Sequence, residues 1–270
     1  MAIITISRGS FSRGKEVAEK VASDLGYKCL SREVILDASD RYHIPEIKLI
    51  KAIHDAPSIL ERIGRSKFAY IAYYQSALAR AVQEDNVVYH GLAGHLLLKG
   101  IPHVLKVRII ADLASRVKIE MERDGIGEQE ARALILRNDQ ERRNWTQSLY
   151  GVDTRDSSLY DIVIHINNFK VSDAADIICR AAVLEQFRAT REAQQKMDDL
   201  ALASRIKAAL VDISIDVAVL SEYGNVLVYT KADERISRKL EEKFKTLHGE
   251  IDEIHNIEFH PGVPIPPNAI

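Results

Sequence analysis

Short apolar runs alternate with longer amphipathic stretches over the first two thirds of the chain. Ile3–Ile6 is a β-branched run that ends at a Gly/Ser loop, which is typical of a buried strand. Val17, Val21 and Leu25 then recur at helical spacing until Gly26. Further strands are predicted at 86–91, 103–111 and 160–166, and helices within 32–83 and at 112–123, 128–147 and 172–188. This alternation predicts a three-layer α/β domain whose parallel sheet is covered on both faces.

The pattern changes near residue 185. Residues 184–210 form a long helical pattern without glycine or proline, which predicts a helix that bridges two domains. A β-hairpin is predicted around Tyr223-Gly224-Asn225, followed by a helix at 232–247, a strand at 251–259 and an extended proline-rich tail. We therefore expect two domains, at residues 1–190 and 191–270, of which the second is a small α+β module.

The charge, apolar runs and cysteines of the chain disfavour several classes of function. The chain has 270 residues and a formal net charge of −2, so its overall charge favours neither nucleic acid nor an anionic membrane. No apolar run reaches the roughly 18 residues of a membrane span. Cys29 and Cys179 lack metal-ligand spacing, and the opening residues form a strand instead of an export signal. A cytoplasmic location is therefore expected.

The segment from Gly9 to Lys15 fits the pattern G-x-x-x-x-G-K between a predicted strand and a predicted helix. In such a loop, backbone N–H groups coordinate phosphate oxygens, and the lysine neutralises phosphate charge. The alternative is a glycine-rich turn with a solvated lysine. Glu16 stands where the pattern normally has Ser or Thr for magnesium, so its carboxylate is the candidate Mg²⁺ ligand.

Arginines gather on the two helices predicted before the last strand of the first domain. Arg116 and Arg123 are seven residues apart and share a helical face, and Arg142 lies on the next helix. A helical hairpin that carries arginines can close over phosphates, exclude water and bind oxygens with planar guanidinium groups. The alternative is a solvated, salt-bridged helix pair, because glutamates lie nearby.

These features, taken together, resemble the cytidylate kinase-like family of nucleoside monophosphate kinases over residues 1–185. The likeness lies in "ITISRGSFSRGKEVAEKVASDLGYKCLSREVI", in "NVVYHGLAGHLLL", and in a third block with Arg116, Arg123, Asp139, Arg142, Gly151, Asp153 and Tyr160-Asp161. It implies a P-loop NTPase fold that uses ATP and Mg²⁺. It also implies phosphoryl transfer to CMP, dCMP or a related monophosphate.

The resemblance implies a role for each matching residue. The loop would hold ATP with Gly9, Ser10, Phe11, Ser12, Arg13, Gly14, Lys15 and Glu16, and Glu16 would meet Mg²⁺. The acceptor nucleotide would be held by Arg32, Gly91, Asp139 and Asp153. Lys15, Arg116, Arg123 and Arg142 would act on the transferring group. Asp139 and Arg142 would form either a pair that aims Arg142 or an exposed ion pair of little effect.

The chain departs from the family pattern at several positions. Leu92 stands where relatives carry an arginine, Phe11 and Arg13 make the loop bulkier, and His165-Ile166 replaces an Asn-Thr pair. These changes favour an alternative function. The chain would then be a non-catalytic or weakly active nucleotide-binding sensor that signals through its C-terminal module.

Residues 197–260 resemble a BON domain, with Gly224 at the hairpin turn. The likeness implies a regulatory or dimerising module with an unknown ligand, which leaves a homodimer open. A third alternative makes this module the working part, as a lipid or protein binder. The aromatic-rich segment 68–75 is predicted to pack in a helix core, with base stacking as its alternative. His90 and His95 lack partners at ligand spacing and are predicted to pack or lie on the surface.

Overall fold

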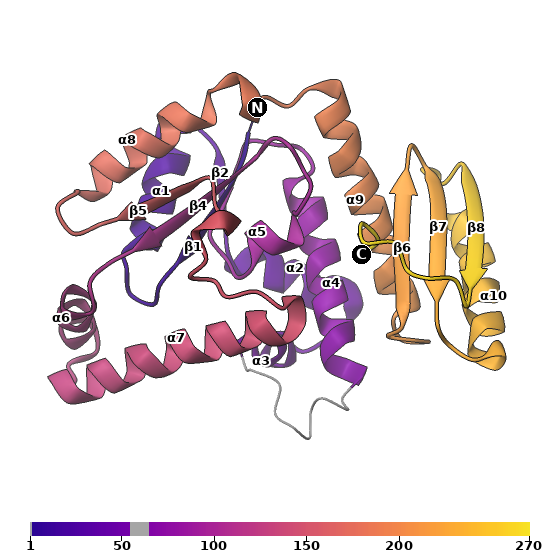
Figure 1. The fold of residues 1–270 in the computed structure, drawn as a ribbon, viewed down its shortest axis with the longest axis horizontal. Coiled ribbons are helices and arrows are strands. Elements are labelled where there is room, and N and C mark those ends of the chain that lie inside the picture. The colour runs from indigo at the N-terminus through magenta and orange to yellow at the C-terminus, as the bar shows by residue number, and fades with distance from the viewer. Residues whose placement is uncertain (1, 55–64) are drawn as a thin grey trace. The chain divides into compact units, whose positions relative to one another are not determined.

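The computed structural model describes residues 2–54 and 65–270 (Figure 1), so residues 55–64 of the predicted helical stretch lie outside the described residues. Contacts divide the chain into two compact units. The first unit holds residues 2–33, 50–54 and 84–190, and the second holds residues 34–49, 65–83 and 191–270. The limits expected from the sequence, 1–190 and 191–270, follow chain order, whereas the compact units interleave along the chain.

The first unit is built on a parallel sheet of five strands in the order β2-β3-β1-β4-β5. The strands are β1 (Ile3–Arg8), β2 (Lys28–Leu30), β3 (Val87–Tyr89), β4 (Val104–Ile110) and β5 (Ile162–His165). The predicted parallel sheet is therefore confirmed. Strand β2 was not predicted, because three residues are too few to show a period.

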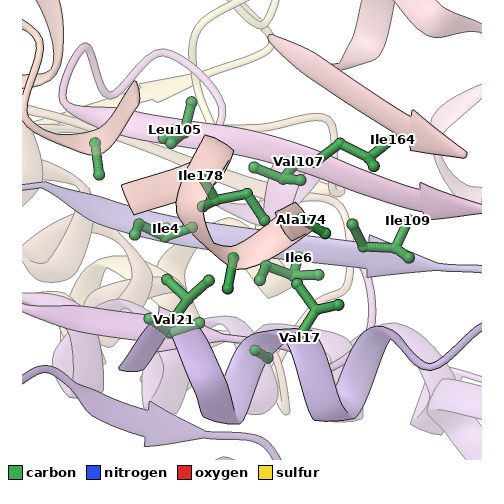
Figure 2. Packing of buried hydrophobic residues seen from close by; sticks show 14 of the residues in the cluster. Ile4, Ile6, Val17, Val21, Leu105, Val107, Ile109, Ile164, Ala174 and Ile178 are labelled. Carbon is green, nitrogen blue, oxygen red and sulfur yellow. The ribbon is translucent and has the colours of Figure 1, made fainter. Parts of the chain in front are cut away.

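Apolar side chains of the central strands form the core of this unit (Figure 2). Ile4 and Ile6 of β1 and Val107 of β4 pack against helices α1 (Gly14–Leu25) and α8 (Val171–Ala182). Strand residues alternate between faces, so Thr5 points the other way, toward helix α5 (Gly94–Leu97). Burying each large aliphatic side chain stabilises the fold by about 2 kcal/mol, which fixes the strands and the loops at their carboxyl ends.

Two helices follow β4 and form a hairpin beside the sheet's carboxyl edge. Helix α6 (Leu113–Asp124) ends at Gly125, whose φ of 67° is the left-handed conformation that favours glycine. Helix α7 (Glu128–Tyr150) returns from there, and the Trp145 indole donates to the carbonyl of Ala52 at 2.8 Å. The helices predicted at 112–123 and 128–147 are confirmed.

The long helix predicted at 184–210 is interrupted. Helix α8 ends at Ala182, a 3-10 turn η3 covers Glu185–Phe187, and α9 begins only at Arg191. Helical spacing continued across the break in the sequence, so periodicity alone did not reveal it. The remaining helices before β3 are α2 (Arg32–Tyr42), α3 (Glu46–His54) and α4 (Arg65–Val82).

The second unit combines α4 and α9 with a small mixed sheet. Strands β6 (Val217–Glu222) and β7 (Asn225–Thr230) form the predicted antiparallel hairpin around Tyr223-Gly224. Helix α10 (Glu234–Glu250) leads to β8 (Asn256–Pro261), which pairs parallel to β7. The α–β–β–α–β order agrees with the sequence pattern, and the likeness to a BON domain stays a prediction.

Helix α4 buries its aromatic segment in the second unit. Ala69, Ala72 and Tyr73 pack against Ala208 and Val211, and Tyr42 stacks on Tyr73 with ring centroids 4.4 Å apart. The core packing predicted for residues 68–75 is therefore confirmed for these side chains, but it is wrong for Phe68, which is 45% exposed. Of the helices that the structure describes, none combines the length and apolar character needed to cross a membrane.

Candidate active site

The glycine-rich loop joins the carboxyl end of β1 to α1. The Gly9 N–H donates to the Ile109 carbonyl at 3.1 Å, and the Ser12 hydroxyl donates to the Gly9 and Ile109 carbonyls at 3.0 and 3.2 Å. Phe11 and Arg13 have φ values of 57° and 59°, in the left-handed region that non-glycine residues seldom adopt. Such strain is typical of loops that are shaped for a ligand.

The beginning of α1 is suited to an anion. Arg13, at the N-cap, has a side chain that accepts no hydrogen bond from the backbone amides of the helix. The first amides of α1 therefore have no side-chain acceptor from the cap residue, and the helix dipole adds positive potential there. Gly14 is required by close packing, since a Cβ at this position would lie 2.7 Å from the Cβ of Arg8.

Arg116 connects the helical hairpin to the loop. Its Nε donates to the Ser10 carbonyl at 2.6 Å, and its Nη2 lies 2.6 Å from Asp139 Oδ2. The other oxygen of Asp139 accepts the Ser10 N–H at 3.1 Å. Asp139 thus pairs with Arg116 and the loop, in place of the pair with Arg142 that the sequence suggested.

Arg142 is half-buried beside the loop. Its Nη1 donates to the carbonyl of Arg8 at 3.1 Å. Burial, together with the charges of Arg8, Arg116 and Arg108, lowers the pKa of Arg142 to about 10. Burial also lowers the pKa of Arg8. Four guanidinium groups therefore lie near one another at the carboxyl ends of β1 and β4.

Arg108 is held by hydroxyl groups. Its Nη1 lies 3.1 Å from the Tyr160 hydroxyl and 3.3 Å from the Ser7 hydroxyl, and its guanidinium lies over the Tyr160 ring. Among the residues that the structure describes, no carboxylate forms an ion pair with Arg8, Arg108 or Arg142. Of these four arginines, Arg116 alone forms an ion pair with a carboxylate among the described residues. Glu19 near Arg8 and Asp139 near Arg142 offset part of the remaining charge, so the cluster keeps a net positive charge.

Phe11 attaches the loop to the helical hairpin. Its ring packs with Val117, Ala131 and Ile135 of α6 and α7. The Arg123 guanidinium lies 4.4 Å from the centroid of this ring and pairs with Glu120 and Asp124. The bulky residue at position 11 thus contacts the apolar face of the hairpin.

Lys15 and Glu16 occupy the first turn of α1. The side chain of Lys15 is 62% exposed, and its Nζ lies 3.6 Å from Glu19. The carboxylate of Glu16 accepts two N–H groups of Arg13, with a shortest distance of 2.7 Å. A metal ligand role for Glu16 stays a prediction, and it requires Arg13 to release this carboxylate. In the described part of the chain, no group of three or more His, Cys, Asp or Glu side chains is placed to hold a metal ion.

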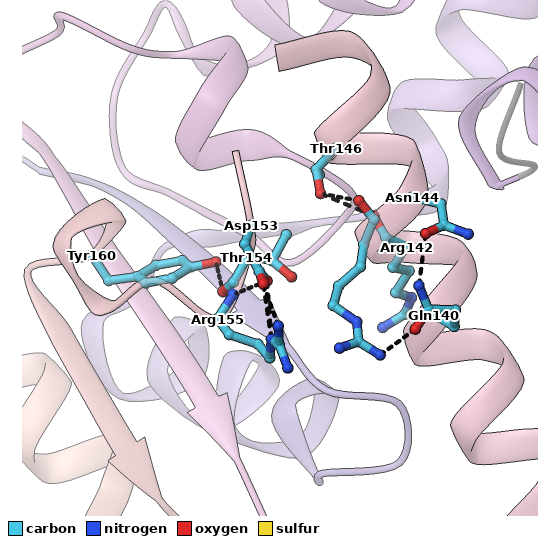
Figure 3. Close-up of polar contacts among 9 residues, drawn as sticks. Gln140, Arg142, Asn144, Thr146, Asp153, Thr154, Arg155 and Tyr160 are labelled. Atoms are coloured by element: carbon cyan, nitrogen blue, oxygen red, sulfur yellow. Dashed lines mark hydrogen bonds and ion pairs between the residues drawn. The ribbon is translucent and has the colours of Figure 1, made fainter. Parts of the chain in front are cut away.

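The other predicted acceptor residues lie around the same edge of the first unit. Arg32 is the first residue of α2, and a Cβ on Gly91 would lie 2.2 Å from the Tyr89 hydroxyl. Asp153 binds Arg155, which lowers the pKa of Asp153 to about 2 (Figure 3). The carboxylate of Asp153 therefore binds a residue of its own loop. Its role in binding the acceptor nucleotide stays a prediction.

Sequence reasoning missed a polar cluster beneath the loop. The Tyr160 hydroxyl donates to the Thr154 carbonyl at 3.0 Å and lies 3.4 Å from His95 Nε2 (Figure 3 shows Tyr160 and Thr154). Burial lowers the pKa values of His90 and His95 to about 4, so both imidazoles are neutral near pH 7. The missed signal was Arg108, a charged residue between Val107 and Ile109 of a buried strand.

Comparison with known proteins shows the family of this chain. A sequence profile described as "Cytidylate kinase-like family" matches residues 3–168, which is more than half of the chain. The chain belongs to the cytidylate kinase-like family. The family match ends before α8, α9 and the small sheet.

Individual relatives cover the same part of the chain. A cytidylate kinase of Sulfolobus acidocaldarius is 30% identical over 176 residues, which are 65% of this chain and 91% of that protein. A cytidylate kinase of Methanosarcina acetivorans is 36% identical over 97 residues, covering 36% of this chain and 53% of the relative. An uncharacterized protein from Eubacterium ventriosum has a similar fold, with a TM-score of 0.51 at 23% identity over 67% of this chain and 98% of its own.

Proposed function

We propose that this chain is an ATP-dependent nucleoside monophosphate kinase. The observation that carries the proposal is a cluster of four arginines beside the glycine-rich loop: Arg8, Arg108, Arg116 and Arg142. Three of them form no ion pair with a carboxylate among the described residues. Positive charge that is half-buried and crowded in this way is unfavourable unless an anion compensates it. Two nucleotides bring several phosphate groups, so they supply the missing charge.

The loop would hold the donor, ATP. The N-terminus of α1 suits its phosphates, and Lys15 would leave Glu19 to reach the β and γ oxygens. The N–H groups of Gly9, Ser10 and Ser12 already donate within the protein, so they would bind phosphate only after exchanging those acceptors. Magnesium would neutralise phosphate charge when bound. It usually keeps several waters and takes few protein ligands, so Glu16 alone would suffice from this chain.

The acceptor would lie on the other side of the arginine cluster. Arg32, Gly91 and Asp153 would contact it, and CMP or dCMP is the acceptor that the named relatives suggest. In this proposal Arg142 would span the two nucleotides, because it touches the backbone of Arg8 at the beginning of the loop. Arg116 and Arg123 would close the hairpin over the transferring group.

Phosphoryl transfer needs positioning and positive charge more than covalent chemistry from the protein. Arg116 is fixed before reaction by Asp139 and the Ser10 carbonyl, so little reorganisation is needed when charge develops. The apolar contact of Phe11 with α6 and α7 would keep water away from the transferring group.

The test is a coupled ADP-release assay with ATP, Mg²⁺ and a panel of CMP, dCMP, UMP, AMP and GMP. We expect turnover with CMP or dCMP, and a loss of about a hundredfold or more in Lys15→Ala, since one charged donor to the transition state is removed. Lys20→Ala is the matched control, because Lys20 lies on the same helix and pairs with Asp24.

Wild-type activity in Lys15→Ala would remove this lysine from the mechanism. Binding of ATP without turnover on any acceptor would instead favour the nucleotide-sensor function. The relatives named above carry kinase names and give that alternative no support.

A further inference from the structure

Arg108 differs from the arginines of the helical hairpin in the element that carries it. Arg116 and Arg142 lie on α6 and α7, whereas Arg108 belongs to β4, inside the parallel sheet between β1 and β5. Its partner in the strand register is Ser7, which lies two residues after Thr5 and on the same face, the one that α5 covers. Because residues paired between neighbouring strands point to the same face, Arg108 also lies on the α5 face. The sheet therefore fixes the place of Arg108 independently of the hairpin.

Hydroxyl groups hold one side of the Arg108 guanidinium. Nη1 donates to the Tyr160 hydroxyl at 3.1 Å and to the Ser7 hydroxyl at 3.3 Å. The Tyr160 hydroxyl gives its own proton to the Thr154 carbonyl at 3.0 Å, so its oxygen accepts from Arg108 (Figure 3 shows Tyr160 and Thr154). These partners are neutral, so they orient the guanidinium without neutralising its charge.

The opposite edge of the guanidinium is formed by Nε and Nη2. Neither nitrogen has a hydrogen-bond partner among the described residues, and neither is fully buried, because Arg108 is only partly covered. The N–H groups of this edge are parallel, as the two oxygens of one phosphate or carboxylate require. Arg108 thus presents a preoriented, bidentate donor edge to an oxyanion.

Hydrogen bonds link Arg108 to the two segments that carry proposed acceptor residues. The carbonyl that binds Tyr160 belongs to the residue directly after Asp153. The same Tyr160 hydroxyl lies 3.4 Å from Nε2 of His95 in α5, four residues after Gly91. Burial lowers the pKa of His95 to about 4, so this imidazole adds no positive charge near pH 7. The open edge of Arg108 is therefore the cationic group of the region where the acceptor would lie.

We propose that Arg108 binds the phosphate of the acceptor nucleotide through Nε and Nη2, and that Tyr160 and Ser7 position it. This assignment rests on the kinase function proposed above. A nucleoside monophosphate brings both the oxygen pair and the negative charge that the open edge of Arg108 needs. The sheet then binds the acceptor phosphate before the hairpin closes, whereas Arg116 and Arg142 act from the hairpin.

The test measures binding of CMP, cytidine and ATP to the full chain by calorimetry. In Arg108→Met, which keeps an apolar stem, we expect CMP to bind at least about tenfold more weakly, because two charge-assisted hydrogen bonds are lost. Cytidine has no phosphate and ATP has its own site in the loop, so the affinity for each should stay as in the wild type. Unchanged binding of these two ligands also shows that the variant is folded.

Two further variants separate binding from structure. Lys106→Met is the matched control, because Lys106 is a cation of the same strand, two residues earlier, and pairs with Asp161. It should bind CMP as the wild type does. Tyr160→Phe keeps the ring and removes the hydroxyl that holds Arg108, so CMP should bind more weakly while cytidine should not. A merely structural role of Tyr160 would weaken the binding of both ligands alike.

Wild-type affinity for CMP in Arg108→Met would overturn the assignment, as would an equal loss of affinity for CMP and cytidine. A loss confined to ATP would also overturn it, since the donor phosphates would then be the ligand. Failure of the kinase proposal is seen separately, as wild-type protein that binds CMP but releases no ADP in the coupled assay.

Discussion

At the residue scale, the charge of Arg142 lowers the stability of the nucleotide-free protein, and its proposed role is to bind nucleotide. Its burial among other arginines disfavours its charge, as its lowered pKa shows. Residues kept for function in an unfavourable setting are a common source of the conflict between stability and activity. We therefore expect the nucleotide-free protein to tolerate the loss of this charge better than the reaction does.

Arg142→Met tests this trade-off. The melting temperature without nucleotide should stay equal or rise, because a buried charge is removed and its long apolar stem is kept. Turnover should fall by about a hundredfold, and the stabilisation given by bound nucleotide should shrink. Thermal melts with and without ATP and CMP measure both effects. A clearly lower melting temperature of the nucleotide-free variant would show that the guanidinium stabilises the fold.

At the element scale, the contact between the loop and the α6–α7 hairpin depends on one ring. Phe11 enters an apolar cluster with Val117, Ala131 and Ile135, and Arg123 covers its ring. In the sequence, Phe11 is a bulky residue that departs from the family pattern of the phosphate loop. The structure gives it a packing role, with the ring directed at the hairpin.

Phe11→Ala should loosen the hairpin without changing the sheet. We expect a loss of about 2 kcal/mol in the free energy of unfolding, because a partly buried aromatic ring is removed. Hydrogen exchange should become faster in α6 and the first half of α7, while β1 and β4 keep their protection. Leu136→Ala is the control, since Leu136 lies on α7 with 49% of its surface exposed. Unchanged exchange in α6 would contradict the role given to Phe11.

At the scale of the whole molecule, the sequence predicted the parallel sheet, the loop, the arginine hairpin and the β-hairpin, because each has a strong local period or motif. It did not predict β2 or the break after Ala182, which have weak local signals. The pairing of Asp139 with Arg116 was also missed. It depends on where two helices lie in space, which spacing within one helix does not reveal.

The packing of α4 in the second unit bears on the domain limits. Ala69, Ala72 and Tyr73 are buried against α9, so a chain of residues 1–190 would expose them. We expect this fragment to melt without a cooperative transition and to bind a hydrophobic dye, whereas the full chain melts cooperatively. Calorimetry of both chains measures the difference. A cooperative transition in the fragment would support a domain boundary at residue 190.

The C-terminal residue partly covers one border of the small sheet. Val219 of β6 exchanges two backbone hydrogen bonds with Ile270, each 3.0 Å long, while β8 forms the opposite border of the sheet. Strand addition from another copy is therefore obstructed at the middle of β6 by Ile270, and along β8 by Glu258 and the proline at 261. Each border thus carries an obstacle to a further strand, which disfavours growth of the small sheet from one chain to the next.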